Sequence, residues 1–277
     1  LDPNTNPNLR QNINQVAMNN EVDYDNAQFD GNEVRQGDES AYADAQTRFD
    51  ETISQYGIGF VAIPNYDIHL PILAGMSDDN LFTGVGTYSP DRELGKDNFV
   101  AMSHSMRGGR DKLLNRLDEV VADTPIYATD YENVYEFRVT YNKDIHETEV
   151  EHIANDYDEG PILTLFRCIG GWGTEWRQML HADLVDTKPI EQADEEVLIE
   201  LGLEDYANAR AKAEVEAETA EVEQPSIQAA AGEDSNIFKQ LSNSAYLFTG
   251  ENMEIILKAG VGVVILLAIV TIGLFFV

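Results

Sequence analysis

Short apolar segments broken by turn residues occupy the middle of the chain, from residue 56 to residue 185. In residues 134–141, apolar side chains alternate with polar ones. The apolar positions are Tyr135, Phe137, Val139 and Tyr141. A period of two residues places one apolar and one polar face on a β-strand. Further strands are predicted at residues 59–63, 68–73, 99–103, 125–129, 162–167 and 176–183. Seven or eight short strands predict an all-β barrel or sandwich, with helical pieces near residues 78–82 and 110–117.

The charge of the chain limits its partners. Among 277 residues there are 18 Lys and Arg against 50 Asp and Glu, a net charge of −32. Binding of nucleic acid needs clustered cations to neutralise phosphates, so we expect no nucleic-acid partner. A hydrophobic fraction of 43% is ordinary for a folded chain. The acidic excess therefore belongs to surfaces and tails.

The two ends differ from the middle. Residues 1–55 are rich in Asn, Gln and Asp, and we expect a polar, extended or partly helical arm that packs loosely. Residues 186–258 are expected to form an acidic stalk and juxtamembrane segment, because thirteen acidic residues and three basic ones lie between positions 186 and 224. Residues 259–277 carry no charge over 19 positions. At about 1.5 Å per residue, this run predicts a transmembrane helix.

The single cysteine, Cys168, excludes an internal disulfide framework and a Cys-based zinc site. A lone cysteine is usually a small buried side chain, so its neighbours decide its interpretation. Cys168 ends a predicted strand, and Arg177 opens the next one nine positions later, across a Gly-rich loop. His104 ends another apolar run before a Gly-containing loop. Three strand ends could therefore bring a thiol, an imidazole and a guanidinium together.

The local sequences resemble those of the sortases, cysteine transpeptidases of Gram-positive cell surfaces. Residues 163–168, Leu-Thr-Leu-Phe-Arg-Cys, are similar to the family's Thr-Leu-x-Thr-Cys strand end. Residues 173–177, Gly-Thr-Glu-Trp-Arg, are similar to the arrangement in the pilin-type class (class C). Upstream, residues 59–64 and 68–86 resemble the early strands of the family and the turn before its histidine. The resemblance covers about residues 56–185.

The resemblance implies a closed, roughly eight-stranded β-barrel. It implies Cys168 as the nucleophile, His104 as the acid and base, and Arg177 as the group that stabilises the substrate carbonyl. The substrate would be a surface protein with a Leu-Pro-x-Thr-Gly-like sorting signal, cut between Thr and Gly and joined to an amine acceptor, a cell-wall precursor or a pilin Lys. The enzyme would be anchored in the cell membrane, with its catalytic domain extracellular and no cofactor required.

Two departures from the family pattern bear on specificity. Arg167 replaces the usual Thr before the cysteine, and Ser103 stands where Gly is common before the histidine. The single Asp-Pro, at Asp2, is not followed by an aromatic residue, so a pilin-type N-terminal lid is not supported. We expect the substrate groove to include Thr164, Arg167, Trp172 and Trp176.

Three alternatives stay open. Loop carboxylates could together bind Ca²⁺; they are Asp78, Asp79, Asp91, Glu93, Glu147, Glu149 and Glu151. The barrel could be a non-catalytic surface-binding module that kept the fold, or a thiol peptidase that only hydrolyses, because fold alone does not specify chemistry.

Overall fold

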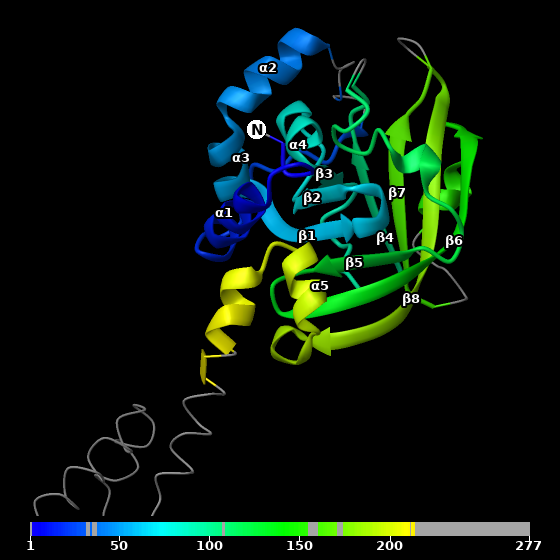
Figure 1. Ribbon diagram of the computed structural model, residues 1–277. Helices are drawn as coiled ribbons and strands as arrows, with labels where there is room; N and C mark the ends of the chain where they lie inside the picture. The colour runs from blue at the N-terminus through cyan, green and yellow to red at the C-terminus, as the bar shows by residue number, and fades with distance from the viewer. Residues whose placement is uncertain are drawn as a thin grey trace, which may run out of the picture. The chain divides into compact units, whose positions relative to one another are not determined.

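Eight strands of the described chain close into a barrel, which confirms the predicted architecture. They are β1 (Gly57–Ile63), β2 (Ile68–Leu73), β3 (Val85–Thr87), β4 (Asn98–Ser103), β5 (Pro125–Thr129), β6 (Asn133–His146), β7 (Ile162–Cys168) and β8 (Trp176–Pro189). Their order around the barrel is β1, β2, β3, β4, β7, β8, β6 and β5, and β5 pairs with β1 (Figure 1). The pairs β2 with β3 and β4 with β7 are parallel.

This computed structural model describes residues 2–31, 34, 38–106, 109–154, 160–170, 174–210, 212 and 213. All of them belong to one unit, Leu1–Glu218. Residues 214–258 of the predicted stalk, the predicted membrane helix at 259–277 and Trp172 lie outside the described residues. Within the described part, no helix combines the length and the apolar character needed to cross a bilayer.

Apolar side chains from all eight strands fill the barrel, as alternating strand positions predict. Tyr135, Phe137 and Val139 of β6 belong to this core. Tyr141, predicted on the same face, instead packs with Phe166 and Met179 in a second cluster on the opposite face of the sheet. The pairing of β6 with β8 shifts register between Val139 and Tyr141. Such a bulge adds one residue and so reverses the face of every later side chain.

Short helices complete the fold. They are α1 (Pro7–Met18), α2 (Glu39–Thr47), α3 (Phe49–Tyr56), η2 (Pro64–Tyr66), α4 (Asp78–Thr83), η3 (Leu117–Glu119), η4 (Val150–Ile153), η5 (Ile190–Gln192) and α5 (Glu195–Glu200). Helix α4 is the one predicted near residues 78–82. The helix predicted at 110–117 is replaced by turns and η3, because Leu113 has a left-handed φ of 49°, which interrupts a right-handed helix.

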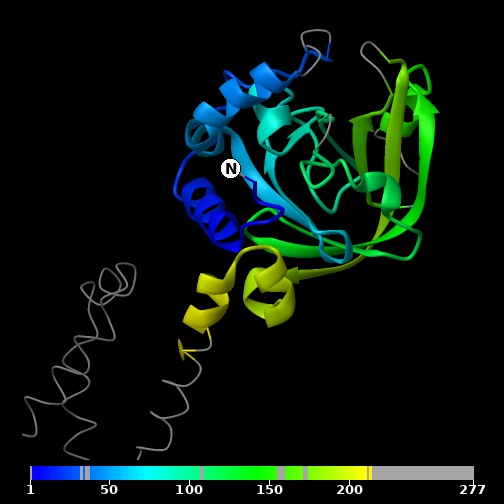
Figure 2. The same cartoon turned by 45° about the horizontal axis from the view of Figure 1, so that its top comes forward.

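The N-terminal arm is helical and packed, contrary to the expectation of loose packing. Helix α1 begins with Pro7 after Asn6, whose side chain accepts a hydrogen bond from the Leu9 amide. Leu9 and Ile13 of α1 are buried with Phe49 of α3 in a cluster outside the barrel. Helices α1 and α3 pack on β1 and β2, whereas α2 packs on α4 (Figure 2). The buried apolar residues of α1 are isolated from one another in the sequence, but they share one face of the helix.

The segment after β8 also packs on the barrel, which corrects the expectation of a solvated stalk for residues 190–207. Its buried apolar side chains join the same outer cluster as α1: Ile190, Ala193, Leu198, Leu201, Leu203 and Ala207. The Asn14 side-chain amide donates to the carbonyls of Leu201 (2.8 Å) and Gly202 (2.9 Å). Gly202 has a φ of 73° and lies against Arg10, where a Cβ atom would clash. Most of the acidic residues around them are exposed, and the half-buried Glu200 contacts His69 of β2 (2.8 Å).

We predict that Leu198→Ala lowers the free energy of unfolding by about 2–5 kcal/mol, because Leu198 is fully buried at 0% exposure and its loss leaves a cavity. Ile199→Ala is the matched control. The Ile199 side chain, next to Leu198 in the sequence, is 42% exposed, so this substitution should change the free energy of unfolding by less than about 0.5 kcal/mol. Urea unfolding of the full chain measures both. Equal stability of the two variants would show that this segment does not contribute to the folded core.

Candidate active site

The three predicted catalytic residues lie at neighbouring strand ends at one end of the barrel. Parallel pairing of β4 with β7 places Ser103 opposite Arg167, so His104 leaves β4 beside Cys168, the last residue of β7. Antiparallel pairing of β7 with β8 places Cys168 directly opposite Arg177. The strand order thus brings together residues that are 64 and 9 positions apart in the sequence.

The three side chains differ in their exposure to solvent. Cys168 is partly buried, and the side chain of Arg177 is partly exposed. His104 is 6% exposed. The Ser105 hydroxyl donates a hydrogen bond to the Cys168 carbonyl and so joins the loop after β4 to the end of β7. Cys168 and Arg177 are therefore partly exposed to solvent, whereas the imidazole lies deeper.

Helix α4 makes most of the contacts with His104 that the structure shows. The His104 amide donates to the Leu81 carbonyl (3.0 Å), and the ring packs on Phe82 with centroids 4.2 Å apart. The Nε2 atom lies 3.2 Å from Asp78 Oδ1, and because an ionised carboxylate can only accept a hydrogen bond, Nε2 is the donor. Burial lowers the pKa of His104, and the hydrogen bond to the Asp78 carboxylate opposes that shift. The environment of the imidazole therefore comes largely from one short helix.

The guanidinium of Arg177 is held at the start of β8. It donates to the carbonyls of Thr174 (2.7 Å) and Trp176 (3.0 Å), and its second terminal nitrogen donates to Glu147 Oε2 (2.7 Å). Glu147 directly follows β6, which pairs with β8 at this end of the barrel. These contacts fix the cation opposite the thiol-bearing residue in the strand register.

Two of the predicted groove residues are largely inaccessible. Thr164 is fully buried and donates from Oγ1 to Asn98 Oδ1 (2.7 Å), so this position does not fit a peptide contact. Arg167 points to the opposite face of β7 from Cys168, as strand alternation requires. It forms an ion pair with Asp118 of η3 (3.2 Å), and its Nε atom is buried with no hydrogen-bond partner among the described residues. Burial lowers the pKa of Arg167.

Trp176 remains the groove candidate that the structure exposes. Its side chain is 51% exposed at the start of β8, directly before Arg177, and packs edge-on against His146 with ring centroids 5.5 Å apart. An exposed indole beside a reactive centre can cover part of a bound peptide. Trp172 lies outside the described residues, so its predicted role stays a prediction.

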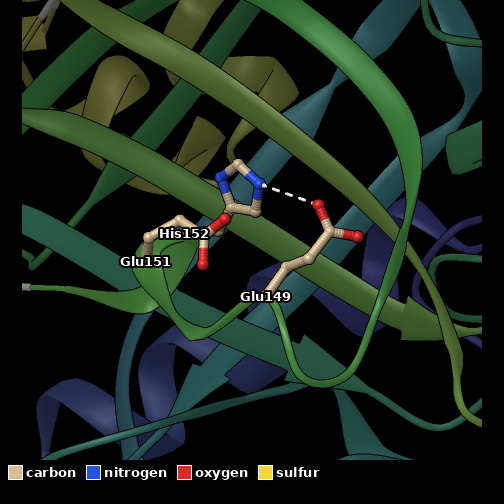
Figure 3. Close-up of side chains that lie close together, drawn as sticks. All are labelled: Glu149, Glu151 and His152. Atoms are coloured by element: carbon tan, nitrogen blue, oxygen red, sulfur yellow. Dashed lines mark ion pairs between the residues drawn. The ribbon is translucent and has the colours of Figure 1, made fainter.

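The carboxylates predicted to share a Ca²⁺ ion are divided among several contacts. Asp79 pairs with Arg48, and Glu93 pairs with Lys96. The described residues contain one group of three whose ligand atoms lie within 4.8 Å of one another: Glu149, Glu151 and His152. Figure 3 shows these three side chains on η4 and the turn before it, with His152 facing Glu149. Glu149 and Glu151 belong to the predicted set, and binding of Ca²⁺ stays a prediction.

Sequence reasoning did not identify the carboxylates that contact the imidazole and the guanidinium. Asp78 and Glu147 were considered only as ligands of a metal ion. The available signal for Asp78 was its place after Ser77, a typical helix N-cap, at the start of a predicted helix. That pattern predicts where the helix begins, but not that its first turn lies beside His104, which is 26 positions later in the sequence.

A closed barrel that brings a thiol, an imidazole and a guanidinium to one end has the groups needed for cysteine-dependent acyl transfer. The profile of the Sortase domain matches residues 61–185. Sortase A of Listeria monocytogenes is 32% identical over 175 residues, which cover 63% of this chain and 75% of that protein. Sortase A of Streptococcus agalactiae is 32% identical over 145 residues, 51% of this chain and 58% of that protein.

The chain belongs to the sortase family of cysteine transpeptidases, which act on sorting signals. The crystal structure of Listeria monocytogenes sortase A is similar with a TM-score of 0.49 and 31% identity, covering 54% of this chain and 99% of that one. The two curated relatives described above are named sortase A, whereas the sequence resembles the pilin-type class around Arg177. The subclass therefore stays a prediction.

Proposed function

We propose that this protein cleaves a Leu-Pro-x-Thr-Gly-like sorting signal between Thr and Gly and joins the new Thr carbonyl to an amine. The observation that carries the proposal is the register of the strand ends, with Cys168 opposite Arg177 and beside the strand that leads to His104. Membership of the sortase family supports the same chemistry.

The proposed reaction has two steps. The Cys168 thiolate attacks the Thr carbonyl carbon, and Arg177 donates hydrogen bonds to the oxyanion that develops. His104 gives a proton to the Gly nitrogen as the Thr–Gly bond breaks, which leaves a thioester on Cys168 and releases the Gly amine. An incoming amine then attacks the thioester, passes a proton to His104 and releases the thiolate. These three side chains supply nucleophile, acid and oxyanion donor without a cofactor.

The acceptor and the location are further parts of the proposal. The amine would come from a cell-wall precursor or from a Lys of a pilin, and the donors would be surface proteins with a C-terminal sorting signal. The uncharged run at residues 259–277 supports an anchor in the cell membrane. Membership of the sortase family supports a barrel outside the cell. The peptide would lie over the accessible end of the barrel near Trp176.

Mixing the full chain in detergent with a Leu-Pro-x-Thr-Gly peptide, with and without an amine acceptor, tests the proposal. We expect a product joined to the acceptor and a thioester adduct on Cys168, both detected by mass spectrometry. A scrambled peptide is the control. Cleavage at the same rate without an acceptor would favour a thiol peptidase, and no cleavage of any sorting peptide would favour a binding module.

A further inference from the structure

Helix α4 makes three different contacts with His104, through a backbone carbonyl, an aromatic ring and a carboxylate. We propose that Asp78 is the positioning residue of His104, accepting a hydrogen bond from Nε2–H so that Nδ1 is the nitrogen that transfers the proton. The inference rests on the proposed acid and base role of His104. A neutral imidazole has one N–H group and one lone pair, so fixing the proton on Nε2 leaves the lone pair on Nδ1.

Asp78 is held firmly enough to act in this way. It is the first residue of α4, whose N-cap Ser77 accepts a hydrogen bond from the Asn80 amide (3.2 Å). The buried Asn80 side chain donates to the carbonyls of Ala74 (2.8 Å) and Gly75 (3.1 Å), directly after β2. The first turn of α4 is thereby joined to the barrel. The Asp78 carboxylate is therefore held in a fixed position beside the imidazole of His104.

The N-terminal arm supports α4 from outside. Arg48, which follows α2, donates to both carboxylate oxygens of Asp79 (2.7 and 2.6 Å). The ring of Tyr42 in α2 packs edge-on against Phe82, and the Gln46 side chain donates to the Phe82 carbonyl (3.3 Å). The N-terminal arm thus packs against Phe82, whose ring contacts the imidazole of His104.

The charged groups near His104 have different partners. Asp78 contacts the imidazole, Asp79 on the same helix is paired with Arg48, and Arg167 on β7 is paired with Asp118. Asp78 favours the imidazolium, whereas burial disfavours it. Removing the Asp78 charge should therefore lower the pKa of the imidazole, and removing the Asp79 charge should not.

The pKa of the imidazole can be measured without any substrate. In full chain carrying ¹³C-labelled histidine, the His104 ring signal is assigned by its loss in His104→Gln and followed by NMR against pH. We expect Asp78→Asn, which keeps the side-chain shape, to lower the midpoint by about one pH unit. Asp78→Glu should keep the wild-type midpoint within a few tenths of a unit, and Asp79→Asn is the matched control. An unchanged midpoint in Asp78→Asn would overturn the proposal.

Kinetics then show whether the contact matters for turnover. Asp78→Asn should lower kcat about 10-fold with little change in KM, while Asp78→Glu recovers most of the rate. An equal loss in Asp79→Asn would overturn the proposal, because it would mean that α4 acts only as a structural support. If no transpeptidation occurs in the wild type, the proposed function fails, but the NMR midpoints still test the contact between Asp78 and His104.

Discussion

Replacing Cys168 by Ala is expected to abolish acyl transfer while leaving the barrel folded. Without the thiol no thioester can form, and removal of a catalytic nucleophile typically costs about 10⁴-fold or more in kcat. The side chain is small and partly buried at the end of β7, so its removal leaves the barrel core intact. Peptide cleavage followed by mass spectrometry measures the loss, and circular dichroism verifies the fold.

The control for this experiment is Ser105→Ala, which removes the neighbouring hydroxyl that donates to the Cys168 carbonyl but keeps the thiol. We expect this variant to form the thioester adduct. Turnover by Cys168→Ala at a rate near that of the wild type would exclude the thiol as the nucleophile and with it the proposed mechanism.

The second large effect is expected for Arg177→Ala. Loss of a well-placed oxyanion donor typically lowers the rate by about 10²–10³-fold. Because Arg177 is partly exposed and is the second residue of β8, the substitution should leave the melting temperature nearly unchanged. Stopped-flow measurement of thioester formation separates the first step from the second and should show the loss in the first.

Two variants control for charge and for the ion pair. Arg138→Ala removes another partly exposed arginine, on β6, whose partner is Glu136 rather than a group at the candidate site. It should retain the wild-type rate. Glu147→Gln removes the carboxylate that pairs with Arg177 while keeping the guanidinium. Wild-type kinetics in Arg177→Ala would show that another group stabilises the oxyanion.

The barrel was predictable because strand alternation is a local signal. Each strand carries its own pattern of apolar and polar residues, as in residues 134–139, and those patterns delimit most of the strands closely. The bulge after Val139 was not predictable, since it arises from pairing with β8 and not from any residue of β6 alone. Tyr141 was therefore assigned to the wrong face.

The helical arm and the segment after β8 escaped prediction for a related reason. Each has too few apolar residues to bury a face alone, and only together with β1 do Ile13 and Leu198 enter one cluster. The cysteine, histidine and arginine stand at or beside the ends of predicted strands, but their roles came from the resemblance of the surrounding sequence to the sortases. Their carboxylate partners were not identified, because Asp78 and Glu147 approach through tertiary contacts in a chain with 50 acidic residues.

The path of β8 has a mechanical consequence. The strand begins with Trp176 and Arg177 at the candidate site and ends at Pro189, from which the chain continues through η5 into α5. The twelve residue steps from Arg177 to Pro189 correspond to about 40 Å of strand. Tension on the chain beyond α5 would therefore enter at the far end of β8, where the contacts of α5 with α1 and β1 resist it. The start of β8, which carries Arg177 and pairs with Cys168 of β7, is the part of this strand farthest from the point where the force is applied.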